Sequence, residues 1–252
     1  MVRKFTVPLV AILVFLGVWE ALVWINDWPN YVMASPSDLP AAYSKFWNLF
    51  LIMGWQTLWR TVVGLLLAIV FGVALGMVMG FSRTMRDALY PLLVGFNAIP
   101  KATVVPIVAL LFVGAHDMNT ALIAFMISFF PIAVSVSIGL STLEPEYRDI
   151  LRSLGASQAT IFWKIALPKT LPEFFGALKV AVTLAFIGTN LMEIVSPHGR
   201  GLGALFDSGK TNADYPLMFA VLIALAFLGI VLYYVVVALE KIFAGWAERQ
   251  PT

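Results

Sequence analysis

Six long runs of apolar residues, separated by short polar segments, divide the chain. An α-helix needs about 20 mainly apolar residues to cross the hydrocarbon core of a bilayer. The pattern therefore predicts an all-α integral membrane protein with six transmembrane helices, at 5–25, 57–81, 88–113, 119–140, 171–194 and 217–240. The third run is the weakest, because it is interrupted by Pro91, Pro100, Lys101 and Pro106.

The first run follows a basic pair, Arg3 and Lys4, which is also how a secretory signal peptide begins. Its apolar stretch is longer than the roughly 7–15 residues of a signal peptide, and no small-residue cleavage site follows it. We therefore interpret it as an uncleaved first span.

Composition supports a membrane location and excludes several classes of function. Hydrophobic residues make up 61% of the chain and charged residues only 12%, against about 25% charged residues in soluble domains. The partner that this implies is the lipid bilayer, and a formal net charge of +2 is too small to indicate nucleic acid. Without cysteine there is no disulfide, thiolate nucleophile or cysteine-ligated metal.

Lysine and arginine residues are distributed unevenly over the connecting segments. With the N-terminus in the cytoplasm, the cytoplasmic segments hold Arg3, Lys4, Arg83, Arg86, Arg148, Arg152, Lys164, Lys169, Lys241 and Arg249. The outer segments hold only Lys45, Arg200 and Lys210. Because positive residues accumulate on the cytoplasmic side of membrane proteins, we expect both termini to be cytoplasmic.

The cytoplasmic segment between the fourth and fifth spans is amphipathic. Helical spacing gives it one apolar face, formed by Leu143, Tyr147, Ile150, Leu151 and Leu154. Gly155 then suits a left-handed helix stop. Ser157 is a candidate N-cap for a second short helix, which should end before Pro168, and Thr170 to Glu173 has the pattern of a capping box that opens the fifth span.

These patterns predict a helix–turn–helix that is tethered to the bilayer at both ends. Two interpretations stay open on physical grounds. The pair of helices either lies in the headgroup layer or docks into a groove on a soluble partner.

A family resemblance favours docking. Gly155, nine intervening residues and Ile165-Ala166-Leu167-Pro168 resemble the G-x9-I-x-L-P core of the EAA signature of binding-protein-dependent ABC importer permeases. In place of the family's Glu-Ala-Ala this chain has Asp149-Ile150-Leu151, so the acidic residue is kept. The resemblance implies a coupling helix seated on an ATPase subunit, with contacts at or near Asp149, Ile150, Leu151, Leu154, Gly155, Ala156, Ser157, Ile165, Leu167 and Pro168.

The resemblance covers about residues 56–240 and implies the type I ABC importer permease fold there. Residues 1–55 would then form an N-terminal transmembrane helix and an outer loop, and residues 241–252 a cytoplasmic tail. It also implies a homodimer of permease subunits, two ATP-binding cassette subunits that hold ATP and Mg, and an outer solute-binding protein, in a bacterial inner membrane. The chain itself is then expected to bind no cofactor and to catalyse no reaction.

Three stretches, SPSDLPAAY, IPKATVVPIVALLFVGA and FFPIAVSVSIG, resemble the nitrate/sulfonate/taurine branch of that family. The branch handles sulfonates, nitrate, bicarbonate, aromatic acids and pyrimidine or vitamin precursors, and Lys101 favours a small anion. An ATP-independent carrier or channel is the alternative. A membrane-embedded enzyme is a third hypothesis, and it requires paired catalytic side chains that we do not find.

Small residues recur every four positions in the second span. One helix face carries Gly64, Ala68, Gly72, Gly76 and Gly80. Such a face allows close approach of another helix backbone. The pattern predicts helix packing and leaves open whether the partner helix belongs to the same subunit or to a second copy.

Candidates for the translocation path lie in the interrupted third span and in the fourth. A lysine at the bilayer centre costs about 2.5–3.5 kcal/mol, so Lys101 either faces the path or snorkels to the interface. Proline frees backbone carbonyls that a water-filled cavity can satisfy, which adds Pro100, Pro106 and Pro131 as weaker candidates.

Near the outer end of the fifth span, Asn190 and Glu193 share a helix face and either line the outer mouth of the path or cap the interface. Arg60 lies near a predicted span end, where its long side chain can snorkel, that is, extend to the membrane surface and keep the guanidinium in water.

Sequence motifs for catalysis and nucleotide binding are absent. HGRGLG at 198–203 superficially resembles a dinucleotide loop, but it follows a membrane span and not a strand, so an outer turn is expected. His116 and His198 have no metal-ligand spacing, and no Walker, H-E-x-x-H or G-x-S-x-G sequence occurs. The sequence therefore predicts no metal site and no ATP hydrolysis by this chain alone.

Overall fold

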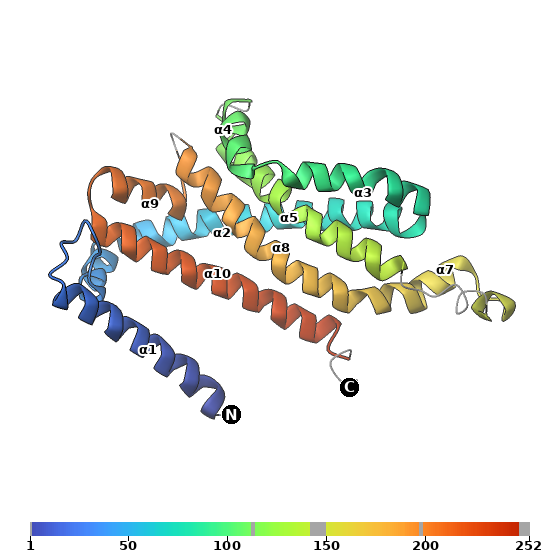
Figure 1. The fold of residues 1–252 in the computed structure, drawn as a ribbon, viewed down its shortest axis with the longest axis horizontal. Coiled ribbons are helices and arrows are strands. Elements are labelled where there is room, and N and C mark those ends of the chain that lie inside the picture. Colours follow the sequence, from blue (N-terminus) through green and yellow to red (C-terminus); the bar gives the residue numbers. More distant parts are fainter. Residues whose placement is uncertain (1, 112–113, 142–149, 197–198, 247–252) are drawn as a thin grey trace.

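The computed structural model describes residues 2–111, 114–141, 150–196 and 199–246, and within these ranges all regular structure is helical (Figure 1). The elements are α1 (Val2–Ile25), η1 (Pro36–Asp38), α2 (Leu39–Phe81), α3 (Arg83–Ala98), α4 (Lys101–Leu111), α5 (His116–Ser141), α7 (Gln158–Ile161), the π-helix η2 (Phe162–Ala166), α8 (Leu167–Val195), α9 (Leu202–Thr211) and α10 (Tyr215–Phe243). The predicted all-α architecture is confirmed over these residues.

Four helices in the described ranges are long and apolar enough to cross a membrane: Pro36–Phe81, His116–Ser141, Phe162–Val195 and Tyr215–Phe243. The first predicted run corresponds to a shorter apolar segment of α1, Val10–Ile25. The second predicted span, 57–81, lies within α2, which begins earlier, at Leu39. A residue with non-helical backbone angles, Phe46, separates its first turns from the rest.

The third predicted span is broken at Pro100, in agreement with the interruption that the sequence predicts. It consists of α3 and α4, which meet at an angle of 87° and together would count as a fifth span. Pro100 has no N–H to donate, and it restricts the residue before it to extended conformations. Ile99 is extended accordingly, and α3 ends at Ala98.

The small-residue face of α2 packs against α5 of the same chain. A Cβ atom added at Gly64 would lie 2.5 Å from the Ala124 Cβ, and one added at Gly76 would lie 2.7 Å from the Ala133 carbonyl oxygen. A Cβ atom added at Gly72 would lie 2.9 Å from the Ile132 Cβ, one added at Gly80 would lie 2.8 Å from the Leu140 Cβ, and Ala68 is fully buried. The backbones of α2 and α5 are therefore in contact along most of the span. The helix that packs on the small-residue face belongs to the same subunit.

α8 covers a second face of α5, and α10 lies beside α8 (Figure 1). The Lys179 ammonium on α8 binds both Glu240 oxygens on α10, each at 2.9 Å. α1 stands away from this bundle in Figure 1. It contacts the bundle near its C-terminal end, where Trp19 and Val23 join a buried cluster with residues of α2 and α10.

Candidate functional site

The turn that carries the EAA-like sequence adopts the predicted left-handed stop. Gly155 has φ +79°, a conformation that glycine reaches without strain. Its N–H donates to the Arg152 carbonyl at 2.9 Å, and the Ala156 N–H donates to the Leu151 carbonyl at 3.0 Å, which closes the helical turn 150–153. The predicted N-cap is also confirmed, since the Ser157 hydroxyl accepts the Thr160 N–H at 3.1 Å.

We name residues 150–157 the docking turn. Its apolar residues divide into two sets. Leu151 and Ala156 pack against the core, whereas Ile150 is 57% exposed and Leu154 78% exposed. Asp149 and the rest of the predicted helix at 143–149 lie outside the described residues. The turn therefore displays apolar side chains that the chain itself does not cover.

The second helix does not end before Pro168, and this prediction is wrong. α7 continues through η2 into α8, and the Leu167 N–H donates to the Phe162 carbonyl, five residues back. The wider turn shifts the hydrogen-bond register just ahead of Pro168, whose ring would clash with a carbonyl in α-helical register. Thr170 is no cap either, because its hydroxyl donates to the Ala166 carbonyl at 2.7 Å within the continuing helix.

Lys101 lies at the break between α3 and α4, where its ammonium is occupied. Nζ donates to the carbonyls of Phe96 at 2.6 Å, Ile99 at 3.1 Å and Asn97 at 3.3 Å. These carbonyls lie at the C-terminal end of α3, where the Phe96 carbonyl also accepts the Ile99 N–H at 3.4 Å. A cation at this end of a helix stabilises the helix terminus. Pro106 and Pro131 lie inside α4 and α5 without interrupting them.

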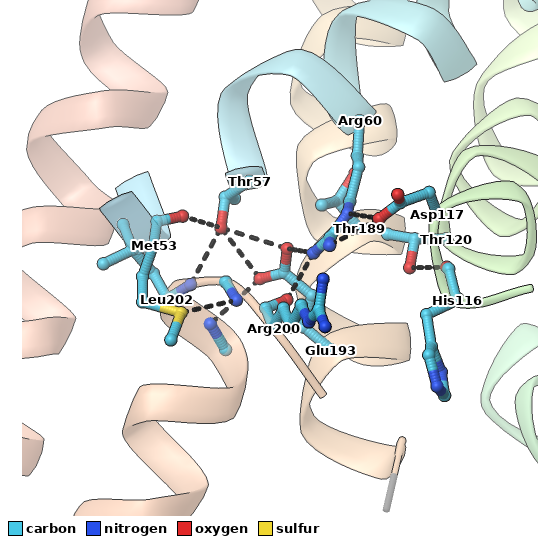
Figure 2. Close-up of polar contacts among 12 residues, drawn as sticks. Met53, Thr57, Arg60, His116, Asp117, Thr120, Thr189, Glu193, Arg200 and Leu202 are labelled. Carbon is cyan, nitrogen blue, oxygen red and sulfur yellow. Dashed lines mark hydrogen bonds and ion pairs between the residues drawn. The ribbon is translucent and has the colours of Figure 1, made fainter. Parts of the chain in front are cut away.

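A polar cluster with a buried centre joins α2, α5 and α8 at the end of the bundle opposite to the docking turn (Figures 1 and 2), and its Asp117 side chain is 55% exposed. At its centre, the Arg60 guanidinium is only 2% exposed. Nη2 and Nε bind Asp117 Oδ1 at 2.6 and 2.8 Å, and Nη1 binds Glu193 Oε1 at 3.2 Å. Nη1 also donates to the Arg200 carbonyl. One cation thus links three helices and the loop after α8.

Glu193 is the second centre of the cluster, and it is 1% exposed. Its oxygens accept the Thr57 hydroxyl at 3.0 and 2.9 Å and the Gly203 N–H at 3.0 Å. The Thr57 oxygen in turn accepts the Leu202 N–H at 2.8 Å. The carboxylate and the hydroxyl therefore occupy the first N–H groups of α9, where negative charge is stabilised.

The glycines of the HGRGLG sequence make room for this carboxylate. Gly201 has φ +115°, and a Cβ atom there would collide with the Glu193 carboxyl group. A Cβ on Gly203 would lie 2.8 Å from the Glu193 Cβ, and one on Gly199 would lie 2.5 Å from the Glu193 carbonyl oxygen. The loop is a turn, as expected, but its glycines serve close packing around one buried acid.

Two expectations about charged residues change with this geometry. Arg60 does not snorkel to an interface, because its guanidinium points into the subunit and binds Asp117, Glu193 and the Arg200 carbonyl (Figure 2). Glu193 is enclosed within one chain, although sequence placed it at an open mouth or an interface. Asn190, one turn earlier, donates its Nδ2 to the Phe186 carbonyl at 2.7 Å. The path roles of Asn190 and Glu193 stay predictions.

Sequence reasoning missed the cluster, although a signal was present. Arg60 and Glu193 are opposite charges inside or near the ends of predicted spans, and Asp117 precedes the fourth span. A charge within a membrane segment nearly always has a partner, and here the partners are one another. What the cluster can do chemically is bind helices together, because separating a buried ion pair leaves an uncompensated charge.

Metal binding finds no support in this geometry. Among the residues with described positions, no three histidine, aspartate or glutamate side chains gather as metal ligands.

Comparisons with known proteins agree with this architecture. Residues 68–247 match the family described as "Binding-protein-dependent transport system inner membrane component". The chain is 30% identical over 244 residues to the formylaminopyrimidine transport permease protein ThiX of Halalkalibacterium halodurans, with 96% of each chain covered. It is 25% identical to the taurine transport system permease protein TauC of Escherichia coli, with 97% of this chain and 90% of the relative covered.

Among solved structures, the chain is similar to one in the inward-facing MetNI methionine ABC transporter. The TM-score is 0.65 at 19% sequence identity, and the match covers 80% of this chain and 98% of the other. At that identity the likeness shows the fold, which is that of a type I ABC importer permease.

Proposed function

Because the chain belongs to the family of binding-protein-dependent transport system inner membrane components, we propose that it forms, as a homodimer, the translocation path of an ABC importer for a small anionic solute. It is a multi-pass membrane protein and a permease subunit of an ABC transporter. Membership implies ATPase and binding-protein partners. ATP and Mg would be held by the ATPase, and this chain would bind no cofactor.

The observation that carries the proposal is the docking turn and its connection to the bundle. Leu154 and Ile150 stand exposed on a tight turn, and uncovered apolar side chains of this kind fit a groove on a partner protein. Residues 158–195 then form one unbroken helix, about 55 Å long at roughly 1.5 Å per residue. This helix ends in the buried cluster at Glu193.

This connection suggests how ATP would drive transport. When two ATPase subunits close on ATP, they would bring the two docking turns together. Each turn would move α8, and α8 would carry α2 and α5 with it, because Arg60 and Glu193 bind these helices at the far end. Opposite movement of the two subunits would switch the path between inward- and outward-open.

The identity of the transported solute is part of this proposal. The relatives named above are described as permeases for formylaminopyrimidine and for taurine, so family membership alone does not select one solute. The preference for an anion comes from the positive charge of Lys101. The same ammonium binds the Phe96 carbonyl at the end of α3, and this structural role is the alternative to attracting a solute.

Both termini and the docking turn are proposed to lie in the cytoplasm of a bacterial inner membrane. The absence of cysteine makes this testable with single-cysteine variants. Lys210→Cys on α9 should react with a membrane-impermeant maleimide added to intact spheroplasts, whereas Ser153→Cys in the docking turn should react only after the membrane is opened. The reverse pattern would refute the orientation.

The decisive experiment asks whether the docking turn binds an ATPase. The tagged chain is purified from its host in mild detergent, and ATP hydrolysis and the P-loop subunit are measured in the eluate. Leu154→Asp should lower the recovered ATPase at least about tenfold, since a charge replaces an apolar anchor at the contact.

Met85→Asp is the matched control, because Met85 is also an exposed apolar residue, 45% exposed, in the first turn of α3 on the same proposed side. This control should retain the ATPase. Equal recovery from Leu154→Asp and the wild type, or equal loss from both variants, would refute docking at this turn. Solute uptake by the purified chain alone in vesicles would instead favour the ATP-independent carrier.

A further inference from the structure

One face of α8 is not covered by the part of the chain that the structure describes. Between residues 180 and 194 the exposed residues are Val180, Thr183, Ile187 and Ile194, and the half-buried Asn190 fills the remaining position of the same face. We name these five residues the α8 stripe. They follow one another at intervals of three, four, three and four residues. This spacing keeps side chains on one line of contact when two helices pack side by side at about 20°.

α4 and α10 flank the α8 stripe without closing over it. On one side, Leu184 and Leu191 pack into a cluster with Val105 and Val108 of α4. On the other side, a half-open groove of about 320 Å³ lies between α8 and α10, and Gly229 forms part of its wall. The α8 stripe therefore faces the surroundings of the subunit.

The polar residues of the α8 stripe make lipid an unfavourable neighbour. Thr183 lies at the centre of the predicted span 171–194, and Asn190 lies about 10 Å further toward the outer end. Asn190 Nδ2 donates to the Phe186 carbonyl, and Asn190 Oδ1 has no hydrogen-bond partner among the described residues. An amide with unused hydrogen-bonding groups is costly in hydrocarbon. Polar side chains of membrane helices bond across to other helices instead.

A second copy of the chain complements the α8 stripe. A two-fold axis beside the stripe places each residue opposite its own counterpart. Thr183 then faces Thr183 and Asn190 faces Asn190, and each of these side chains offers both a donor and an acceptor. Val180, Ile187 and Ile194 form apolar layers between them, with β-branched residues of the kind that pack well at one of the two core positions of a helix pair.

The charge of Glu173 limits the length of this contact. Glu173 lies seven residues before Val180, on the same line of the helix, and it is exposed. The two-fold axis would bring two such carboxylates together at the cytoplasmic end of α8, where like charges repel. The inner ends of the two helices therefore separate, and close packing is expected only over the outer half.

We propose that the α8 stripe is the seam of the homodimer: α8 packs against α8 of a second copy over its outer half, and the two helices diverge toward Glu173. The seam rests on the homodimer of the proposed function and names the surface that forms it. It requires neither the solute nor the ATPase, so it can be measured separately from both.

The test joins a residue to its own counterpart, which only residues beside a two-fold axis can reach. The chain has no cysteine, so Ile187→Cys and Ile194→Cys each introduce a single thiol. In membrane vesicles oxidised with copper phenanthroline, both should form a covalent dimer, because a disulfide needs Cβ atoms about 3.5–4.5 Å apart. The matched controls are Phe227→Cys on α10 and Leu66→Cys on α2, 68% and 55% exposed. They should form about a fifth as much dimer or less.

Glu173→Cys should also form little dimer, because the inner ends diverge. Dimer formation by Glu173→Cys equal to that of Ile187→Cys would overturn the restriction to the outer half. If Ile187→Cys and Ile194→Cys form no more dimer than Phe227→Cys and Leu66→Cys do, the seam is wrong.

A second measurement needs no thiol. Energy transfer between two fluorescently tagged populations of the chain in detergent reports the dissociation constant of the dimer. Asn190→Leu should raise this constant about fivefold, whereas Asn190→Gln, which keeps the carboxamide, should raise it less. An unchanged constant for Asn190→Leu would overturn the polar contact at the seam.

The seam and the proposed function fail in different ways. A covalent dimer at Ile187 from a chain that recovers no ATPase would refute the proposed function and leave the seam supported. Recovery of the ATPase without a covalent dimer above the controls would overturn the seam alone.

Discussion

Replacing Arg60 by methionine tests whether the buried cluster is the link between α2, α5 and α8. The substitution keeps most of the side-chain volume and removes every bond of the guanidinium to Asp117, Glu193 and the Arg200 carbonyl. Glu193, 1% exposed, would retain only the neutral donors Thr57 and Gly203. Removing one partner of a buried pair costs about 3–5 kcal/mol.

That cost can be read as a melting temperature. For a chain of this size each kcal/mol corresponds to about 2–4 °C, so Arg60→Met should melt about 6–20 °C below the wild type in lipid nanodiscs. Glu193→Gln alone should cost less, because Arg60 keeps its partner Asp117. The double variant Arg60→Met/Glu193→Gln should be more stable than Arg60→Met, since its buried acid no longer carries an unpaired charge.

The control is Arg83→Met, which removes an exposed arginine at the start of α3 and should change stability by less than about 0.5 kcal/mol. If Arg60→Met melts as Arg83→Met does, the cluster does not hold the helices together. If the double variant is less stable than Arg60→Met, the penalty does not come from an unpaired carboxylate.

Two pairs of substitutions, each a test variant with its control, probe the glycine contacts. Gly76→Leu should destabilise the fold by about 1–3 kcal/mol or more through overpacking against Ala133, whereas Gly95→Leu, where nothing lies within 4 Å, should be tolerated; equal melting temperatures would contradict the α2–α5 contact. Gly201→Ala should displace the Glu193 carboxyl group and lower expression and thermal stability strongly. Gly114→Ala, at φ +86° in open space, should cost only about 1 kcal/mol of backbone strain. A loss at Gly201 no larger than that at Gly114 would show that the carboxylate has room to move.

Local patterns predicted the turn chemistry well where neighbouring residues decide it. Gly155 stops the helix and Ser157 caps the next one, as expected, because a left-handed residue and a side-chain cap act within four residues of the chain. The same local reasoning failed at Pro168 and Thr170. There a π-turn carries the helix through the proline, and local pattern rules do not anticipate that extra residue.

Local sequence patterns do not predict which side chains pair when they are far apart in the sequence. Arg60 and Glu193 are 133 residues apart in sequence, and each alone is compatible with a side chain that reaches the membrane surface. The glycine spacing in HGRGLG indicated a turn, but the reason for each glycine is a carboxyl group contributed by another helix.

The sequence by itself determined that the chain is helical, that it lies in a membrane and that it carries an importer-like docking segment, because apolar length, charge asymmetry and short motifs are properties of contiguous residues. Only the tertiary structure decided that the glycine face of α2 meets α5, that the third run is bent by 87° and that α8 connects the docking turn to a buried ion pair. These features depend on which helices become neighbours. That choice is made by packing and by the cost of leaving a charge unpaired in a low-dielectric interior.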